Sequence, residues 1–313
     1  MIRVTSLSKN YGGHLAVSDL SFAIEKGKIY GFLGPNGAGK STTMNIITGC
    51  LAATSGQVLI GGHDICAESV QAKRLIGYLP EQPPLYGDMT VAEYLGFAAA
   101  MKGLRAGERR SQIQAVMEKT AIDDVSHRLI RHLSKGYKQR VGVAQAILGK
   151  PEVVILDEPT VGLDPKQIME IRELIRSLGG EHTVILSSHI LSEVRAVCDR
   201  VIILSRGKLV AEDTPENLEK LFAGNSSLSL RVKGCCRQVE EITAGIAGVQ
   251  KLQCAMEDNG VCAVEIMAAE DIAEDVFFAF ADKRVPIIAM QTAHASLEDV
   301  FLELTNGEGG EEP

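Results

Sequence analysis

Hydrophobic residues recur at every second position near the start of the chain, between Ile2 and Val4 and again from Leu20 to Ile24. This alternation predicts half-buried antiparallel strands, and Val58–Ile60 is a further candidate. Other apolar runs show little alternation, which is typical of parallel strands that helices cover on both faces. These runs are Ile29–Leu33, Leu75–Leu79, Val153–Leu156, Val184–Leu186 and Val201–Leu204. We therefore predict an α/β fold that combines a parallel sheet of at least five strands with an antiparallel β subdomain.

Glycine or polar residues stand within three positions of the end of four of these runs. They are Gly34, Glu81-Gln82, Asp157-Glu158 and His189. Parallel strands share one orientation, so these residues should meet at the carboxyl edge of the sheet, where open α/β sheets bind ligands.

Two segments outside the parallel sheet have patterns of their own. Residues from about 88 to 150 show helical spacing, with a capping box at Thr90 and Glu93, and predict a helical subdomain. After a linker at Asn225–Ser227 the order β-α-β-β-α-β predicts a ferredoxin-like α+β domain, with a hairpin turn at Asn259-Gly260. Ser296 is expected to cap a terminal helix. The predicted domains are therefore 1–224 and 225–306, followed by a flexible acidic tail at 307–313.

Composition limits the partners that the chain can have. The chain holds 32 lysines and arginines against 40 aspartates and glutamates, a net charge of -8, so we expect no nucleic-acid partner. Since no apolar run approaches about 18 residues, a membrane span would have to come from another chain. The seven cysteines include no Cys-x-x-Cys pattern and are expected to be reduced thiols. The vicinal pair Cys235-Cys236 could bind a soft metal or act as a redox switch. With no further ligand nearby in the sequence, we expect it to pack in the core.

The stretch Gly34–Ser41 follows the first apolar run and precedes a segment that can form a helix. Its glycines lack Cβ atoms, so consecutive backbone N–H groups can converge on one anion. Lys40 would bring a positive charge to the β- and γ-phosphates of a nucleotide, and the Ser41 hydroxyl would be a ligand of Mg²⁺. The pattern therefore predicts a phosphate-binding loop, although the same residues could also form a glycine turn that binds nothing.

Taken together, the motifs resemble those of the ATP-binding subunit of an ABC (ATP-binding cassette) transporter, over roughly residues 2–220. The matching segments are Gly34–Ser41 as Walker A, Val153–Thr160 as Walker B with the catalytic glutamate, Leu133–Gln139 as the signature motif, Gly162–Pro165 as the D-loop and Ser188-His189 as the switch histidine. The C-terminal domain, which ends in Ser296–Phe301, resembles the accessory domain of many ABC-2 type exporter ATPases, including the gliding-motility-type group. The resemblance implies a P-loop NTPase fold for the first domain.

The resemblance assigns catalysis to Glu158 and His189, and metal binding to Ser41, Gln82 and Asp157. Asp157 would help to hold Mg²⁺ through water, and Glu158 would polarise the attacking water as a general base. Without a nucleotide site the acidic pair would simply be a solvated loop. His189 could reach the γ-phosphate, although a lone histidine is more often a packed or surface residue.

The resemblance also implies which residues bind ATP, with Tyr11 stacking on adenine unless it is an ordinary tyrosine at a strand edge. The others are Gly34, Pro35, Asn36, Gly37, Ala38, Gly39, Lys40, Ser41, Thr42, Gln82, Ser134, Gly136 and Asp164. Ser134 and Gly136 begin a helix whose dipole favours an anion, which in the family is the γ-phosphate held by a second chain. Hydrolysis then requires a head-to-tail dimer, because one chain holds only half of each site.

Two positions depart from the family pattern. The commonest signature motif has glycine and glutamine where this chain has Lys135 and Tyr137, so we expect an altered rate rather than lost activity. The position that usually holds the Q-loop glutamine is Glu81, with Gln82 next to it, and either could sense the metal.

The expected protein is the ATPase subunit of an ABC-2-like exporter, with ATP and Mg²⁺ as cofactors, at the cytoplasmic face of the cell membrane. Its expected partners are a second copy of itself or a paralogous ATPase subunit, and a separate membrane permease contacted through Pro83–Tyr94. One alternative is an ABC ATPase linked to nucleic acid, but the chain lacks the long coiled coils or second cassette that such proteins need. Another is a nucleotide-gated regulatory module, against which Glu158 and His189 argue.

Overall fold

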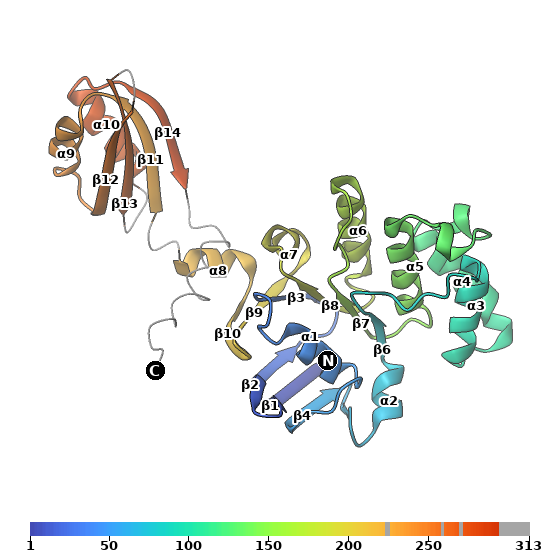
Figure 1. Cartoon of the computed structure of the whole chain (residues 1–313). Helices are drawn as coiled ribbons and strands as arrows, with labels where there is room; N and C mark the ends of the chain where they lie inside the picture. Colours follow the sequence, from blue (N-terminus) through green and yellow to red (C-terminus); the bar gives the residue numbers. More distant parts are fainter. Residues whose placement is uncertain (223–225, 258–259, 269–271, 294–313) are drawn as a thin grey trace. The chain divides into compact units, whose positions relative to one another are not determined.

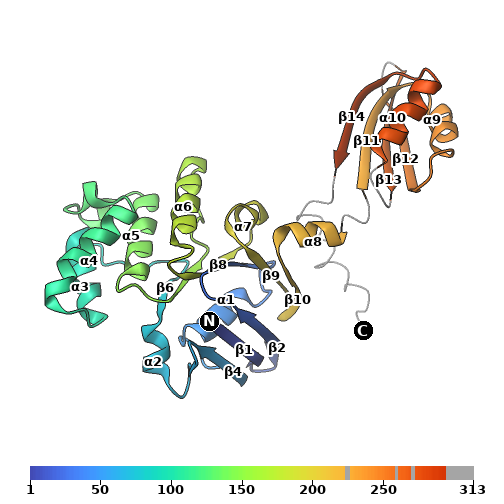
Figure 2. The same ribbon diagram turned by 180° about the vertical axis from the view of Figure 1, so that it is seen from behind.

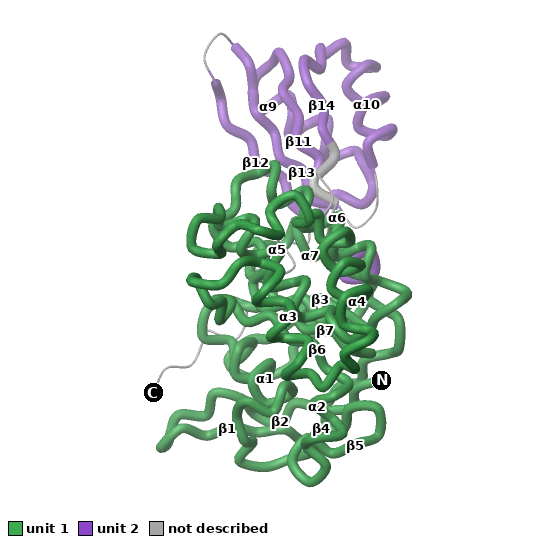
Figure 3. Tube along the Cα trace, turned by 90° about the vertical axis from the view of Figure 1, so that its right-hand side faces the viewer, with its two compact units in different colours: residues 1–214 green, residues 215–313 purple. Residues whose placement is uncertain are grey.

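The computed structural model describes residues 1–222, 226–257, 260–268 and 272–293 and divides the chain into two compact units (Figure 3). Unit 1 is Met1–Thr214 and unit 2 is Pro215–Pro313. The sequence placed the boundary ten residues later, after Gly224. The difference is helix α8 (Pro215–Phe222), which groups with unit 2, and the expected linker residues Ser226 and Ser227 already belong to strand β11 (Ser226–Lys233).

A six-stranded sheet in the order β10-β9-β3-β8-β7-β6 forms the centre of unit 1 (Figure 1). Its parallel strands are β3 (Ile29–Leu33), β6 (Ile76–Leu79), β7 (Val153–Asp157), β8 (Thr183–Ser188) and β9 (Arg200–Ser205). These are the five apolar runs that predicted a parallel sheet, and that prediction is confirmed. The sixth strand, β10 (Lys208–Asp213), pairs antiparallel with β9 and was missed; it is an edge strand whose residues are half-buried or exposed.

A second, antiparallel sheet has the order β2-β1-β4-β5. Its strands are β1 (Ile2–Tyr11), β2 (His14–Ile24), β4 (Ser55–Ile60) and β5 (His63–Asp64). Helix α1 (Lys40–Ile47) lies between the two sheets, as Figures 1 and 2 both show. The main core fills this layer and buries side chains from both sheets and α1, among them Leu20, Phe32 and Met44. Apolar burial of this kind is the dominant favourable term in folding, and here it fixes α1 below the carboxyl edge of β3.

Helices cover the opposite face of the central sheet, where α5 (Lys135–Ile147), α6 (Pro165–Leu178) and α7 (Leu191–Val197) lie above the strands (Figures 1 and 2). Between β6 and β7 the chain forms the helical segment predicted at about 88–150. It contains α3 (Val91–Met101), α4 (Ala106–Lys119), η1 (Asp123–Val125), η2 (Ile130–His132) and α5. The capping box predicted at Thr90 and Glu93 is present, and a short helix α2 (Ser69–Arg74) precedes β6.

Unit 2 contains a four-stranded antiparallel sheet in the order β12-β13-β11-β14. Along the chain its elements are β11, α9 (Cys236–Thr243), β12 (Val249–Glu257), β13 (Val261–Ala268), α10 (Ala273–Asp282) and β14 (Ile287–Ala293). Alternate residues such as Leu230 and Val264 pack against Val276 and Phe280 of α10 in a separate core.

Two sequence predictions lie wholly or partly outside the described residues: the helix capped by Ser296, with the tail at 307–313, and the turn at Asn259-Gly260. Within the described chain, none of the helices combines the length and the apolar character that a membrane crossing requires.

Candidate functional site

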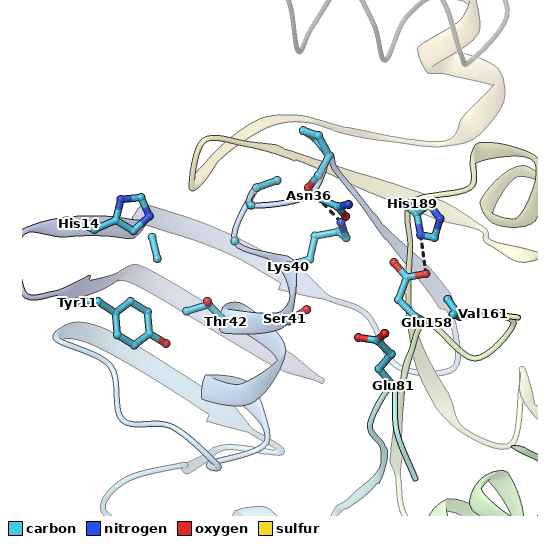
Figure 4. Close-up of a pocket in the computed structure, with 15 residues that line it drawn as sticks. Tyr11, His14, Asn36, Lys40, Ser41, Thr42, Glu81, Glu158, Val161 and His189 are labelled. Carbon is cyan, nitrogen blue, oxygen red and sulfur yellow. Dashed lines mark hydrogen bonds and ion pairs between the residues drawn. The ribbon is translucent and has the colours of Figure 1, made fainter. Parts of the chain in front are cut away.

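The carboxyl edge of the central sheet holds a cavity of about 510 Å³ (Figure 4). Its lining residues are Tyr11, His14, Ala16, Pro35, Asn36, Gly37, Ala38, Gly39, Lys40, Ser41, Thr42, Glu81, Glu158, Val161 and His189. The volume lies within the range of small-molecule sites, about 300–1,000 Å³. Residues that follow β3, β6, β7 and β8 therefore meet in one cavity, as their positions after parallel strands predicted.

The loop after β3 depends on glycine at one crowded position. Gly39 has a φ of 97° and immediately precedes α1. A Cβ atom there would stand 2.7 Å from the Ala16 carbonyl oxygen, so only glycine fits without moving the backbone of β2. The first backbone N–H groups of α1 consequently face the cavity with the positive end of the helix dipole, which is an arrangement that binds anions.

Lys40 is the first residue of α1 and is almost fully buried. Its Nζ donates to the carbonyl oxygens of Gly34 at 2.6 Å and Pro35 at 3.2 Å. Burial lowers the pKa of Lys40 from its usual value, and the nearby carboxylates of Glu158 and Asp157 oppose that shift. The positive charge of this ammonium at the cavity wall favours a bound polyanion, whereas the two carboxylates oppose it unless a cation neutralises them.

Asp157 is the last residue of β7 and is 5% exposed. Among the described groups, its Oδ1 has no hydrogen-bond partner. Burial raises the pKa of Asp157, and the negative charge of Glu81 raises it further, while Ser187 and Lys40 act in the opposite direction. An orphaned buried carboxylate oxygen is costly unless a hydrogen-bond donor or a cation completes it.

Glu158 follows directly and pairs with His189, whose Nδ1 lies 2.9 Å from Glu158 Oε2 (Figure 4). The Glu158 side chain is 12% exposed and that of His189 is 48% exposed. Burial raises the pKa of Glu158, and the contact with His189 partly offsets this effect. Glu158 also has a φ of 48°, a left-handed conformation that costs a residue with a Cβ about 1–2 kcal/mol. This combination of strain, burial and pairing is typical of functional carboxylates.

Glu193 on α7 was missed by the sequence analysis. It is 1% exposed, and its Oε2 accepts hydrogen bonds from Thr160 Oγ1 at 2.6 Å and Ser188 Oγ at 3.0 Å. Thr160 lies two residues after Glu158, and Ser188 directly precedes His189. Glu193 therefore ties together the two segments that carry the Glu158–His189 pair. In the sequence Glu193 is one charged residue in a short helix that also contains Ser192 and Arg195, so nothing marked it as buried.

Replacing Glu193 with alanine is expected to lower the free energy of unfolding by roughly 2–4 kcal/mol and to slow turnover. Two buried hydroxyls lose their acceptor, at a cost of about 1–3 kcal/mol each. Urea unfolding would measure the first effect, and a steady-state assay of the ATP hydrolysis expected from the sequence would measure the second. Glu193→Gln keeps one acceptor oxygen and should lower the free energy of unfolding by less. Glu173→Ala, on the exposed face of α6, should change neither stability nor turnover by much. An alanine variant as stable as the wild type would contradict this role.

Glu81 and Gln82 differ in their position relative to the cavity. Glu81 lines the cavity, whereas Gln82 is not among the lining residues. Both are exposed in the irregular segment after β6. The sequence could not choose between them, because no periodic pattern fixes the direction of two neighbouring side chains beyond the end of a strand. Glu81 thus brings a third carboxylate close to Asp157 and Glu158.

Tyr11 lies at the opposite end of the cavity from Glu158 and is 48% exposed (Figure 4). The Lys9 ammonium stands 5.2 Å from the centre of its ring. The hairpin that joins β1 to β2 also brings His14 and Ala16 to the cavity, and neither was predicted. Neither His14 nor Ala16 belongs to a sequence motif that would have pointed to the cavity. An exposed aromatic side chain such as Tyr11, beside a phosphate-binding loop, can stack on a planar ring of a bound ligand.

Six predicted site residues are not among those that line this cavity: Gly34, Gln82, Ser134, Gly136, Asp157 and Asp164. Ser134 is the exposed N-cap of α5 and accepts from the Tyr137 N–H at 3.4 Å. Asp164 caps α6 in the same way, accepting from the Gln167 N–H at 2.9 Å. Gly136 is buried beneath the end of the Gln167 side chain, which would stand 2.8 Å from a Cβ atom at that position.

Comparison with known proteins gives consistent results. Residues 17–161 match the profile of the family described as "ABC transporter". The chain is 32% identical, over 97% of its length and 98% of the relative's, to the linearmycin resistance ATP-binding protein LnrL of Bacillus subtilis (strain 168). It is 36% identical, over 88% of its length and 96% of the relative's, to the bacitracin transport ATP-binding protein BcrA of Bacillus licheniformis.

Solved structures agree with the sequence relatives. A bacterial ABC transporter cassette, solved as a dimer, superposes with a TM-score of 0.62 at 26% identity. The match covers 68% of this chain and 98% of that one. The central sheet, the glycine loop and the Glu158–His189 pair thus occur in a chain whose relatives are ATP-binding transport subunits. The protein belongs to the ABC transporter family, as an ATP-binding subunit that hydrolyses ATP.

Proposed function

We propose that this chain binds ATP in the cavity above α1 and uses its hydrolysis to drive export through a separate membrane permease. One observation carries the proposal: Lys40, Glu158 and His189, which follow three different strands, line the same cavity. We assign ATP as the substrate because the chain belongs to the ABC transporter family. A regulatory module that only binds nucleotide would have no use for a strained, paired carboxylate next to the phosphate loop.

In this proposal the loop Gly34–Ser41 and the N-terminus of α1 hold the phosphates of ATP, and Tyr11 stacks on the adenine. Glu158 orients and deprotonates the attacking water, and its raised pKa makes it a stronger base than an exposed glutamate. His189 Nδ1 fixes the direction of the Glu158 carboxylate, and its half-exposed ring is free to approach the γ-phosphate.

Side chains at the carboxyl end of the central sheet fit a Mg²⁺ ion. Asp157 offers a buried carboxylate oxygen without a hydrogen-bond partner among the described residues, and Ser41 offers an exposed hydroxyl at the cavity wall. Oxygen ligands of this kind are those that Mg²⁺ prefers, usually with water and substrate phosphates completing its shell. We propose Glu81, in place of Gln82, as the Q-loop residue beside this position. The ion would neutralise negative charge on the phosphates.

Ser134 and Gly136 would complete the cavity of a second chain. They stand outside this chain's own cavity, at the beginning of a 13-residue helix whose N-terminus is exposed. Lys135 and Tyr137 have local partners, since Tyr137 Oη donates to Asp124 Oδ2 at 3.2 Å and the Lys135 ammonium lies beside Gly162. These contacts leave the Ser134 hydroxyl and the helix N-terminus facing outward, as a head-to-tail dimer requires, either with a second copy or with a paralogous subunit.

The proposed permease surface is the segment Pro83–Tyr94 and the adjoining face of α3. Tyr86 is 54% exposed and makes edge-to-face contacts with Tyr94 and Phe97, while Met101 is also exposed. Exposed aromatic residues in contact with one another are typical of the centre of a protein interface. The proposed partner is a permease of the ABC-2 type, which would hold the chain at the cytoplasmic face of the membrane.

We propose the following division of the chain: an ATPase domain at 1–224 with its helical subdomain at about 88–150, and an accessory domain at 225–306 before the tail at 307–313. The ferredoxin-like assignment of the accessory domain is supported by the element order β-α-β-β-α-β and by the antiparallel sheet order β12-β13-β11-β14.

Lys40→Ala is expected to weaken ATP binding by about 10- to 100-fold and to lower turnover, because a hydrogen bond to a charged group contributes about 1.5–3 kcal/mol. Titration with a fluorescent ATP analogue measures the binding. Lys28→Ala is the matched control, because Lys28 is an exposed lysine directly before β3. This variant should bind the ATP analogue as the wild type does. Unchanged affinity in Lys40→Ala would show that its ammonium does not reach the phosphates.

A further inference from the structure

Three cysteines that are far apart in the sequence lie together in unit 2. Cys236 is the first residue of α9, Cys254 lies in β12 and Cys262 lies in β13. Their sulfur atoms all lie within 4.8 Å of one another, and the Sγ atoms of Cys236 and Cys262 are 3.3 Å apart. The sequence analysis expected the pair Cys235-Cys236 to pack only, because it saw no further ligand nearby. The fold supplies two.

The register of the sheet explains how the three side chains meet. Cys254 pairs with Val264 and Cys262 pairs with Met256, so all four side chains lie on one face of the β12–β13 ladder. This is the face that carries the core of unit 2, where Cys262 is fully buried and Cys236 and Cys254 are partly buried. The cluster therefore lies at the margin of the core, with one side enclosed and the other within reach of solvent.

The spacing of the sulfurs suits one central metal ion. A thiolate–metal bond is about 2.3 Å long for zinc, so three sulfurs around one ion in a plane stand about 4 Å apart. The observed sulfur separations, from 3.3 Å to at most 4.8 Å, bracket this value. Small rotations of the Cys236 and Cys254 side chains, which are only partly buried, would equalise them.

We propose that Cys236, Cys254 and Cys262 form a three-thiolate site for one soft metal ion, Cu(I). Among the described residues no histidine, aspartate or glutamate joins the group, so it lacks the fourth ligand that structural zinc sites have. Thiolate and thioether ligands select Cu(I), zinc and iron–sulfur clusters, and the lack of a fourth ligand among the described residues favours Cu(I) over the other two. The thioether of Met256, opposite Cys262 in the register and 55% exposed, stands on the same face as a further soft ligand.

Binding exchanges protons for the ion and changes no oxidation state. Burial raises the pKa of Cys254, and it raises that of Cys262 to about 12 together with the contact to Cys236. These thiols are therefore protonated at neutral pH and react slowly with alkylating agents or disulfides. Each thiol that binds as a thiolate gives up its proton, and three thiolates with one Cu(I) form a complex with a charge of two minus. The first turn of α9, where Cys236 lies, favours such a negative charge.

The test uses the full-length chain, reduced and kept free of oxygen, titrated with Cu(I) in the presence of a chromogenic Cu(I) chelator. One Cu(I) per chain is expected, with only sulfur neighbours in X-ray absorption. Cys236→Ala should weaken binding by at least about 100-fold, the upper end of the loss caused by removing an outer-shell partner. Cys235→Ala removes the exposed neighbouring thiol outside the cluster and should bind as the wild type does.

Several results would overturn the proposal. They are equal binding by Cys236→Ala and the wild type, loss of binding in Cys235→Ala, displacement of Cu(I) by equimolar Zn²⁺, or formation of a Cys236–Cys262 disulfide with no Cu(I) bound. Circular dichroism of each variant separates lost ligands from lost folding. Lys40→Ala should keep full Cu(I) binding, which makes the result independent of the nucleotide site.

Discussion

Glu158→Gln is expected to lower ATP turnover by at least about 10²-fold and to leave Mg²⁺–ATP binding intact, since general bases typically contribute 10²–10⁴-fold. The amide cannot accept the proton of the attacking water. The glutamine side chain has nearly the same shape as the glutamate. Its amide oxygen can therefore take the position of Glu158 Oε2 and accept a hydrogen bond from His189.

Steady-state release of phosphate, combined with equilibrium binding of a fluorescent ATP analogue, separates the two effects. Glu173→Gln on the exposed face of α6 is the control and should hydrolyse ATP at the normal rate. If Glu158→Gln retained near-normal turnover, the base would have to be another group. Glu81 would be the next candidate, because it lines the same cavity.

Ser134→Arg is expected to abolish the ATP-dependent dimer without removing ATP from the cavity of each chain. Ser134 is exposed at the N-terminus of α5 and lies outside its own chain's cavity, so a bulky charged side chain there leaves Lys40 and Glu158 untouched. The lost N-cap costs about 1 kcal/mol of helix stability, too little to unfold the domain. Ser111→Arg, on the exposed surface of α4, is the matched control and should still dimerise.

The parts of the fold that the sequence predicted are those with a strong local pattern. Buried parallel strands leave continuous apolar runs, which is why all five were found, and Thr90 with Glu93 forms the capping box that their spacing indicated. The glycine loop was readable because a φ of 97° and the nearby Ala16 carbonyl leave only glycine at position 39. The apolar runs and the capping box depend on residues that are close together in the sequence, and the contact between Gly39 and the distant Ala16 carbonyl leaves its mark in the residue type at position 39.

The parts that were missed depend on contacts between distant segments. Glu193 acquires its role only when α7 packs against the ends of β7 and β8, and the cysteine cluster forms only in the register that pairs Cys262 with Met256. The choice between Glu81 and Gln82 depends on the path of an irregular segment after β6. No periodic pattern in the sequence contains this information.

The most direct test of the shared-site account is the mass of Glu158→Gln in solution, measured by light scattering with and without Mg²⁺–ATP. The account predicts a shift from the 33.6 kDa of one chain to twice that mass when Mg²⁺–ATP is added. The double variant Glu158→Gln, Ser134→Arg should remain at the monomer mass with ATP bound. A double variant that still dimerises on ATP would contradict the claim that Ser134 and the N-terminus of α5 complete the site of a second chain.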